Sequence, residues 1–156
     1  MSKKSNRKKE RFLNSLPENL IENSLQNFEN KINFNFSFFD KTQGQDFKDW
    51  TKKQLAELLE KLKYYSKETI EYWKKQRAGQ KSSTVLAVYG KFPGRSDFNH
   101  PKHIPLDVEW ARFRLEGDSR VIGFVIKKEE CQRHNICPDT FYVVFLDNTH
   151  DFYKSK

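Results

Sequence analysis

Three β-rich runs near the C-terminus constrain the fold of this chain more than any other feature. Val, Ile, Phe, Tyr and Trp dominate them, as is typical of strands, over Val108–Leu115, Arg120–Ile126 and Phe141–Leu146. The pair Gly117–Asp118 separates the first two runs and indicates a tight hairpin. A longer polar segment, Lys127–Thr140, leads to the third run. The simplest arrangement is a three-stranded antiparallel meander that ends in a polar-aromatic tail over 147–153.

The segments before the meander predict a strand followed by two helices. Alternation of apolar residues over Ile32–Phe38 indicates a half-buried strand. Helical spacing over Asp46–Arg77 predicts a hairpin of two helices, with a break near Tyr64 and Ser66 as the second N-cap. The residues expected on one face of the first helix are Phe47, Trp50, Leu55, Leu58, Leu59 and Leu62. A short extended segment, Thr84–Tyr89, then precedes a long loop over 90–105.

The predicted fold class is therefore α+β, with an N-terminal strand and helical hairpin packed on a C-terminal antiparallel meander. Residues 1–30 are expected to form a basic N-terminal arm, and residues 31–156 the folded domain. Pro17 suits the first turn of a short amphipathic helix that would run to Phe28. Basic arms of this kind often bind nucleic acid or acidic partners, but a solvated tail explains the composition equally well.

The charge balance narrows the class of partner. The chain has 156 residues, 29 Lys and Arg against 21 Asp and Glu, and a net charge of +8. Nucleic acid is the commonest polyanion that attracts such a protein, and charge kept for solubility is the alternative. No apolar run approaches the roughly 18 residues that a membrane span needs, and no apolar segment follows the basic N-terminus as in a secretory signal. We therefore expect a cytoplasmic protein with no membrane partner.

A metal site is not the preferred interpretation of the cysteines. Cys131, His134 and Cys137 could supply three zinc ligands, but no fourth ligand is evident and structural zinc sites need four. A polar loop with two incidental cysteines is favoured, so no cofactor is expected. The three carboxylates of Asp40, Asp46 and Asp49 are interpreted as turn and helix-start residues.

Arginines on the first two runs of the meander could grip a phosphate. Arg112 and Arg114 share strand parity with Trp110, so all three would project from one face of the sheet. Arg120 begins the next run and could join them across the hairpin. A solvated face is the alternative for Arg112 and Arg114. For Arg120 it is an ion pair with a nearby acid, Glu109, Glu116 or Asp118.

At these residues the chain resembles the RelE/ParE superfamily of bacterial toxins. The resemblance covers roughly 32–153 and rests on Arg120–Ile126, on Phe141–Leu146 and on His150 followed by Phe152 and Tyr153. A second similarity is the segment His100–Leu106 that leads into the arginine-bearing run. The resemblance implies a small α+β fold in which a strand and a helical hairpin precede the meander. The basic arm, the Lys127–Thr140 segment and the loop over 90–105 depart from the common pattern.

The resemblance also implies an activity, because most active members are mRNA interferases that cut mRNA on the ribosome without metal. It implies catalytic roles for His150, Arg114, Arg120 and Tyr153, since such cleavage needs proton transfer and cations at the phosphate. Strand parity and the charge of the loop also predict RNA contacts from Arg112 and from five loop residues, His100, His103, Lys91, Arg95 and Lys102. The two histidines could reach the same cleft only if the loop folds over the sheet, and the alternative is that they are ordinary loop residues. Phe152 is expected in the core. The expected partners are RNA and a neutralising antitoxin. The alternatives are a non-catalytic RNA- or ribosome-binding module and a member that binds a protein target.

Overall fold

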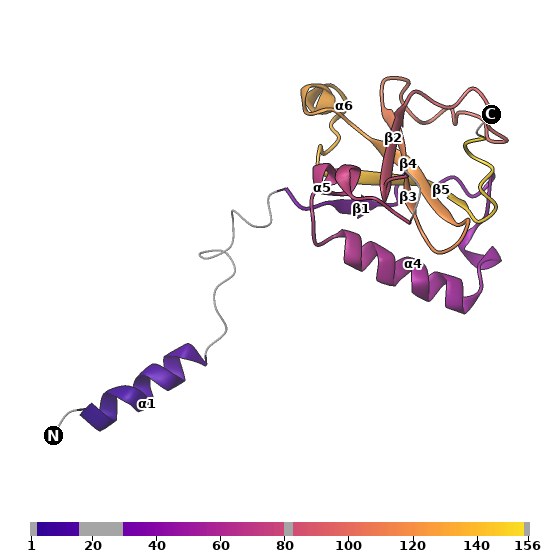
Figure 1. Cartoon of the computed structure of the whole chain (residues 1–156). Coiled ribbons are helices and arrows are strands. Elements are labelled where there is room, and N and C mark those ends of the chain that lie inside the picture. The colour runs from indigo at the N-terminus through magenta and orange to yellow at the C-terminus, as the bar shows by residue number, and fades with distance from the viewer. Residues whose placement is uncertain (1–2, 16–29, 80–82, 155–156) are drawn as a thin grey trace.

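A five-stranded mixed sheet organises the computed structural model, which describes residues 3–15, 30–79 and 83–154 (Figure 1). Its strands are β1 (Asn33–Asn35), β2 (Leu86–Gly90), β3 (Glu109–Arg114), β4 (Arg120–Val125) and β5 (Thr140–Asp147). They lie in the order β1-β5-β4-β3-β2. Neighbouring strands from β2 to β5 pair antiparallel, whereas β1 pairs parallel to β5. The predicted α+β class and the antiparallel meander are confirmed.

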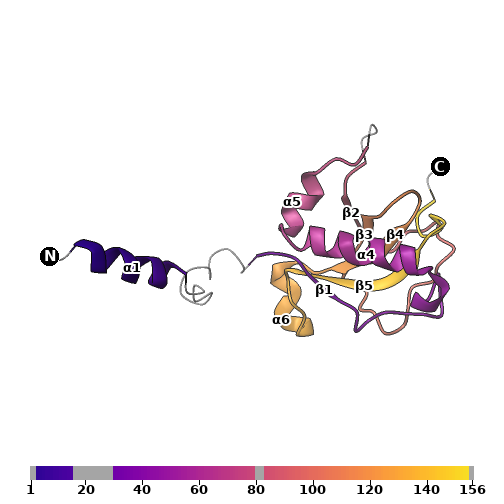
Figure 2. The ribbon, with the colours of Figure 1, turned by 90° about the horizontal axis from the view of Figure 1, so that it is seen from below.

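Helices cover one face of this sheet. The helical elements are α1 (Lys3–Asn14), η1 (Phe47–Asp49), α4 (Lys52–Tyr65), α5 (Ile70–Lys75), η2 (Lys128–Glu130) and α6 (Cys131–His134). The helix α4 lies below the strands in Figure 1 and in front of them in Figure 2, so both views place it on the same face. The helix α5 lies next to β2 and buries Trp73 in the same core.

The helical hairpin forms, but its first helix begins at Lys52 instead of Asp46, and Phe47 lies before it in η1 and is 37% exposed. A capping box of Thr51 and Gln54 begins α4, and the buried stripe Leu58, Leu62 and Tyr65 follows at helical spacing. Leu59, expected in this stripe, is 64% exposed, because its position lies about 100° around the helix from Leu58.

The helix boundary between α4 and α5 also differs from the prediction. Ser66 ends α4 instead of starting α5, and its hydroxyl donates to the Leu62 carbonyl oxygen over 2.7 Å. Thr69 is the N-cap of α5, since its side chain accepts from the backbone N–H of Tyr72. The two residues have the same capping chemistry, so local sequence alone does not choose between them.

The first strand is shorter than the sequence predicts. Only Asn33–Asn35 pair with β5, and Phe34 packs there against Phe113 and Phe141. The chain then turns, because the side chain of Asn35 accepts from the backbone N–H of Ser37. As a result Phe38 packs against Phe124 and Tyr142, on the face of the sheet opposite to that of Phe34.

The basic N-terminal segment contains a helix, α1, which lies before the segment in which the sequence predicts one. Helix α1 lies apart from the sheet in Figures 1 and 2, and its described side chains, residues 7–14, are exposed. The helix predicted over 17–28 lies outside the described residues.

Two cores form, one on each face of the sheet. On the helix-covered face, side chains of α4 and α5 pack on Ala111, Phe113, Val121 and Val143. On the loop-covered face, the loop over 91–107 and the tail over 148–154 pack on Trp110, Ile122, Phe124 and Phe145. Phe152 is buried in this second core, as expected from the sequence. The alternation along β3 therefore places Arg112 and Arg114 on the loop-covered face beside Trp110.

Candidate anion-binding site

Three arginines meet on the loop-covered face. Arg114 of β3 lies directly opposite Arg120 of β4 in the strand register, and Arg112 is two residues along from Arg114 on the same face. Arg112 and Arg120 are only 8% and 6% exposed. Burial, with smaller effects of Arg112 and Arg114, lowers the pKa of Arg120 from its ordinary value. These residues are called the arginine cluster below.

Backbone carbonyl groups hold most of the cluster. Arg112 donates to the Thr84 carbonyl oxygen over 2.9 Å, and Arg120 donates to the carbonyl oxygens of Gly117 and Ser119 over 2.8 and 2.7 Å. Arg114 donates to the hydroxyl oxygen of Ser83 over 3.0 Å. The buried Nε atoms of Arg112 and Arg120 have no partner within the described residues. The guanidinium groups are therefore fixed in place while donors remain unused.

Carboxylates that could neutralise the cluster are engaged elsewhere. Glu116 pairs with Lys61 at 3.0 Å, and Glu109 lies 3.9 Å from Lys127. Over residues 30–79 and 83–154, the structure contains no ion pair between a carboxylate and the cluster. The alternative of an ion pair between Arg120 and an adjacent acid therefore finds no support in the geometry. The negative charge of Asp118 acts on Arg120 without forming an ion pair, and three neighbouring cations with no paired carboxylate form a site that favours an anion.

Asp147 is the acidic residue that lies opposite Arg120 in the sheet, but its carboxylate is hydrogen-bonded to the tail. It lies opposite Arg120 in the pairing of β4 with β5 and is 1% exposed. Its carboxylate accepts from the backbone N–H groups of Thr149, Asp151 and Phe152. Asp147 therefore fixes the path of the tail and forms no ion pair with Arg120 in the described structure.

Two tyrosines border the cluster. The rings of Tyr89 and Tyr153 are stacked, with centroids 4.7 Å apart and planes at 4°. Burial raises the pKa of the Tyr89 phenol, and the nearby positive charge of Arg112 acts against this shift. Because Tyr153 stacks on Tyr89, this catalytic candidate from the sequence lies near the arginines. Its side chain is 42% exposed. Sequence reasoning missed Tyr89, although its parity in the run Thr84–Tyr89 could have indicated it.

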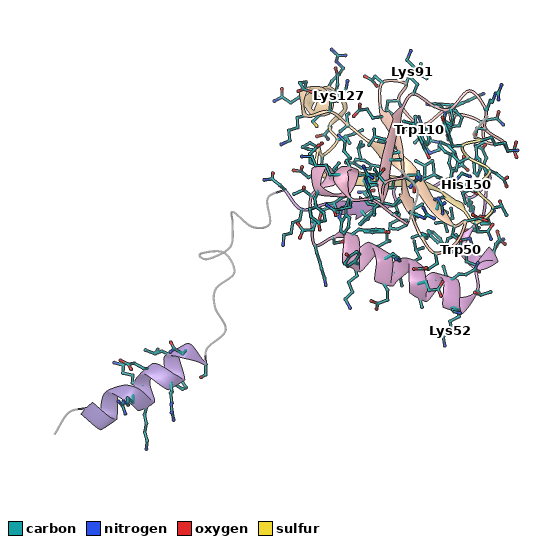
Figure 3. All side chains as sticks on the ribbon, in the orientation of Figure 1. Trp50, Lys52, Lys91, Trp110, Lys127 and His150 are labelled. Atoms are coloured by element: carbon teal, nitrogen blue, oxygen red, sulfur yellow. The ribbon has the colours of Figure 1, made fainter. Side chains whose placement is uncertain are left out.

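His150 lies on the tail that follows β5 (Figure 3). Its backbone has φ of 61°, the left-handed region that His adopts more readily than bulky residues do. The hydrogen bonds of Asp147 to residues on both sides of His150 hold this conformation. Its half-buried ring makes no hydrogen bond or ring contact within the described part of the chain. The structure thus does not bring His150 into contact with the arginine cluster.

The two loop histidines occupy different places. The ring of His100 packs edge-on against Phe92 and Trp110, and its Nδ1 lies 2.9 Å from the Pro101 carbonyl oxygen. His100 is thus part of the aromatic packing above Trp110. His103 stacks on Phe38, and its Nε2 lies 3.1 Å from the carbonyl oxygen of the same residue. His103 is placed by the segment after β1 and not by the arginines.

The long loop does fold over the sheet, and the tail holds it there. The Asp97 backbone N–H donates to the Asp151 carbonyl oxygen over 3.2 Å, and Lys154 pairs with the Asp97 carboxylate at 2.5 Å. The three cationic RNA-binding candidates of the loop are all exposed: Lys91, Arg95 and Lys102. They add positive charge to the surface of the loop and tail.

The carboxylates and cysteines outside this site have local roles. Asp40 accepts from Thr42, and Asp46 and Asp49 form a capping box, as the sequence predicts. The Cys131 thiol donates to the Lys127 carbonyl oxygen over 3.2 Å, and Cys137 is exposed. The described residues contain no group of three or more His, Cys, Asp or Glu side chains placed to hold a metal. The side chain of His134 lies outside the described atoms.

Comparisons with known proteins found nothing similar: no family model, no curated protein and no solved structure matches this chain. Among the described residues, none of the helices is both long enough and apolar enough to cross a bilayer.

Proposed function

We propose that this chain is a toxin-like RNA endonuclease, an mRNA interferase of a toxin–antitoxin or related defence system. The observation that carries the proposal is the arginine cluster, which is fixed by carbonyl groups and has no carboxylate partner among the described residues. Arg binds phosphate oxygens through a planar fork, and RNA presents such oxygens at every nucleotide. The net charge of +8 favours the same ligand.

The arginine cluster and the tail together supply the residue types that metal-independent cleavage needs, although the His150 ring does not contact the cluster in this structure. In this mechanism a base removes the proton of the 2′-hydroxyl, O2′ bonds to phosphorus, and the bond from phosphorus to O5′ breaks. An acid then gives a proton to the departing O5′, so the products carry a 2′,3′-cyclic phosphate and a 5′-hydroxyl. We assign these two proton transfers to His150 and Tyr153, the titratable side chains of the tail, with no cofactor. Arg114 and Arg120, helped by Arg112, stabilise the charge on the phosphate.

The finer likeness to the RelE/ParE fold belongs to the same proposal. The element order, a short strand, two helices and then the β2–β5 strands, agrees with that arrangement, and β1 returns to the sheet beside β5. The proposal also includes ribosome-bound mRNA as substrate and an antitoxin protein as partner. We assign the exposed loop cations Lys91, Arg95 and Lys102 to contacts along the RNA, with His100 and His103 as lesser contributors.

Mapping of mRNA 5′ ends in cells tests the proposal. Wild type, His150→Ala and Arg114→Ala would be expressed under tight induction while growth is followed. We expect growth arrest with new cuts for the wild type, and loss of both for the two variants. Arg133→Ala, which removes an exposed cation of α6, is the control and should behave as the wild type. Full toxicity and unchanged cuts in both site variants would contradict the assignment.

A non-catalytic RNA- or ribosome-binding module is the second candidate. The isolation of the His150 ring from the arginine cluster favours it, because proton transfer needs a group within hydrogen-bond reach of the phosphate. This candidate predicts growth arrest, or RNA binding that weakens steeply with salt, without cuts. A member that binds a protein target instead would keep its activity when the arginine cluster is substituted.

A further inference from the structure

A pocket at one end of the sheet, on the helix-covered side, is lined by aromatic and cationic side chains. It has a volume of about 300 Å³ and lies between the end of α4, the end of α5 and the end of β3. The residues that matter here are Tyr64, Tyr72, Trp73, Arg77 and Arg114. We propose that this tyrosine pocket binds one unpaired nucleotide of the RNA whose phosphate lies at the arginine cluster.

The aromatic rings of the pocket combine exposure with a rigid floor. Tyr64 and Tyr72 are 52% and 40% exposed, and their ring centroids lie 5.2 and 4.9 Å from that of buried Trp73. The Trp73 indole donates to the Tyr65 carbonyl oxygen over 2.7 Å, and the Tyr65 phenol donates to the Arg114 carbonyl oxygen over 2.5 Å. The two exposed rings are therefore attached to a floor that is itself tied to β3.

Arg114 makes the pocket continuous with the arginine cluster. It lines the pocket, and its guanidinium also donates to the carbonyl oxygen of Ala78, another lining residue, over 3.4 Å. The exposed Arg77 adds a second cation. The acid at the rim, Glu116, is paired with Lys61 at 3.0 Å. The balance of charge at the pocket is therefore positive.

This combination fits a single-stranded nucleotide. Aromatic faces stack unpaired bases, and arginines at the edge bind the adjoining phosphates. The volume lies at the lower end of the range for small-ligand pockets, which suits one nucleotide and not a folded RNA. Exposed tyrosines at a helix end add little to the stability of the fold, and the exposed part of their rings offers a surface on which a base can stack.

The inference rests on the proposed function, because it takes RNA as the ligand. Its test uses the whole chain and a 2′-O-methyl hexauridylate, which lacks the attacking hydroxyl and so separates binding from cleavage. Tyr64→Leu and Tyr72→Leu should each weaken binding of this probe about tenfold, since a stacked base contributes about 1–3 kcal/mol. Tyr64→Phe and Tyr72→Phe keep the rings and should bind as the wild type. An abasic hexamer of the same backbone keeps the phosphates but has no base to stack, so its binding should be insensitive to all four changes.

The outcomes separate this inference from the proposed function. Hexamer binding by the Leu variants equal to that of the wild type would overturn the tyrosine pocket and leave the nuclease untouched. Equal weakening by the Phe variants, or no hexamer binding by the wild type at low salt, would also overturn it. Ring-dependent hexamer binding by a protein that makes no cuts in cells would support the pocket and overturn the nuclease.

Discussion

The two faces of the sheet differ in what they bury. The helix-covered face is closed by an apolar stripe of α4 and by Trp73, and its core contains no charged side chain among the described residues. The loop-covered face buries Phe98 and Phe152, with Phe92 packed against them, and also holds the buried Arg112 and Arg120. Regular helices suffice to close the first face, whereas a loop and a tail, tied by specific hydrogen bonds, close the second. The first face is thus an apolar core closed by helices, whereas the second combines an aromatic core with buried arginines that are held by specific hydrogen bonds.

The largest loss of stability should follow Phe113→Ala, which removes a ring from the core of the helix-covered face. Phe113 is fully buried and its ring centroid lies 4.6 Å from that of Tyr65 and 5.0 Å from that of Phe141. We expect a loss of about 3–5 kcal/mol in the free energy of unfolding, from lost contacts and the cavity left behind. Urea denaturation followed by circular dichroism measures it. A loss below 1 kcal/mol would contradict a closely packed helix-covered face.

A smaller loss should follow Asp147→Ala, which acts on the loop-covered face. Three backbone N–H groups of the tail lose their acceptor, and we expect a cost of about 1–3 kcal/mol. Hydrogen exchange should show faster exchange at Thr149, Asp151 and Phe152. Asp147→Asn keeps the shape and one carbonyl oxygen and should cost less. Unchanged exchange at these three amides would show that Asp147 does not fix the tail.

The free energy of unfolding should depend on pH through the titration of Tyr65, whose phenol donates to the Arg114 backbone carbonyl oxygen. Burial, with a smaller effect of Glu116, raises the pKa of Tyr65 to about 12. Since folding raises this pKa, the stabilisation is fully present below pH 10 and is lost as the pH rises from 10 to 12. Tyr65→Phe should cost about 1 kcal/mol at pH 7 through the lost hydrogen bond.

The contribution of Tyr65 is isolated by comparing the wild type with Tyr65→Phe at alkaline pH. Tyr65→Phe should lose less stability than the wild type between pH 10 and 12 in urea denaturation. Tyr89 and Tyr142, whose phenol pKa values are also raised by burial, remain in both proteins and provide the shared background. Equal alkaline losses in the two proteins would show that Tyr65 does not titrate as its burial implies.

The smallest effect should come from Leu59→Lys, which sharpens the boundary of the helix-covered face. Leu59 is 64% exposed, whereas its neighbour Leu58 is 3% exposed. The change at Leu59 should alter the free energy of unfolding by no more than about 0.5 kcal/mol. Leu58→Ala is the matched contrast and should cost about 2–5 kcal/mol. Thermal melts of the two variants measure the difference, and similar losses would mean that α4 presents a different face.

Local patterns in the sequence predict much of this fold. The β-rich composition of Val108–Leu115 and Arg120–Ile126, with the turn at Gly117, predicts the central hairpin, and helical spacing predicts α4. The pattern does not show that Phe38 crosses to the other face, because a side-chain bond of Asn35 turns the chain there. Nor does it choose Leu58 over Leu59, since both are apolar and only packing distinguishes them.

The candidate site is predictable to a lesser extent. Strand parity predicts that Arg112, Arg114 and Arg120 share a face, and the register confirms it. The stack of Tyr89 on Tyr153 depends on how a tail returns to a distant strand, which no local pattern encodes. The separation of His103 from the arginines has the same cause, because the loop over 91–107 is placed by contacts with Phe38 and the tail.

If the arginine cluster holds a phosphate, substituting one of its arginines should change the salt dependence of RNA binding. The affinity of the wild type and of Arg114→Gln for a 2′-O-methyl hexauridylate would be measured over a series of salt concentrations. The plot of log affinity against log salt should lose about 0.7 of slope per phosphate contact removed. Arg133→Gln, the same change at an exposed cation of α6, should keep the wild-type slope. A slope for Arg114→Gln equal to that of the wild type would contradict a phosphate site at the arginine cluster.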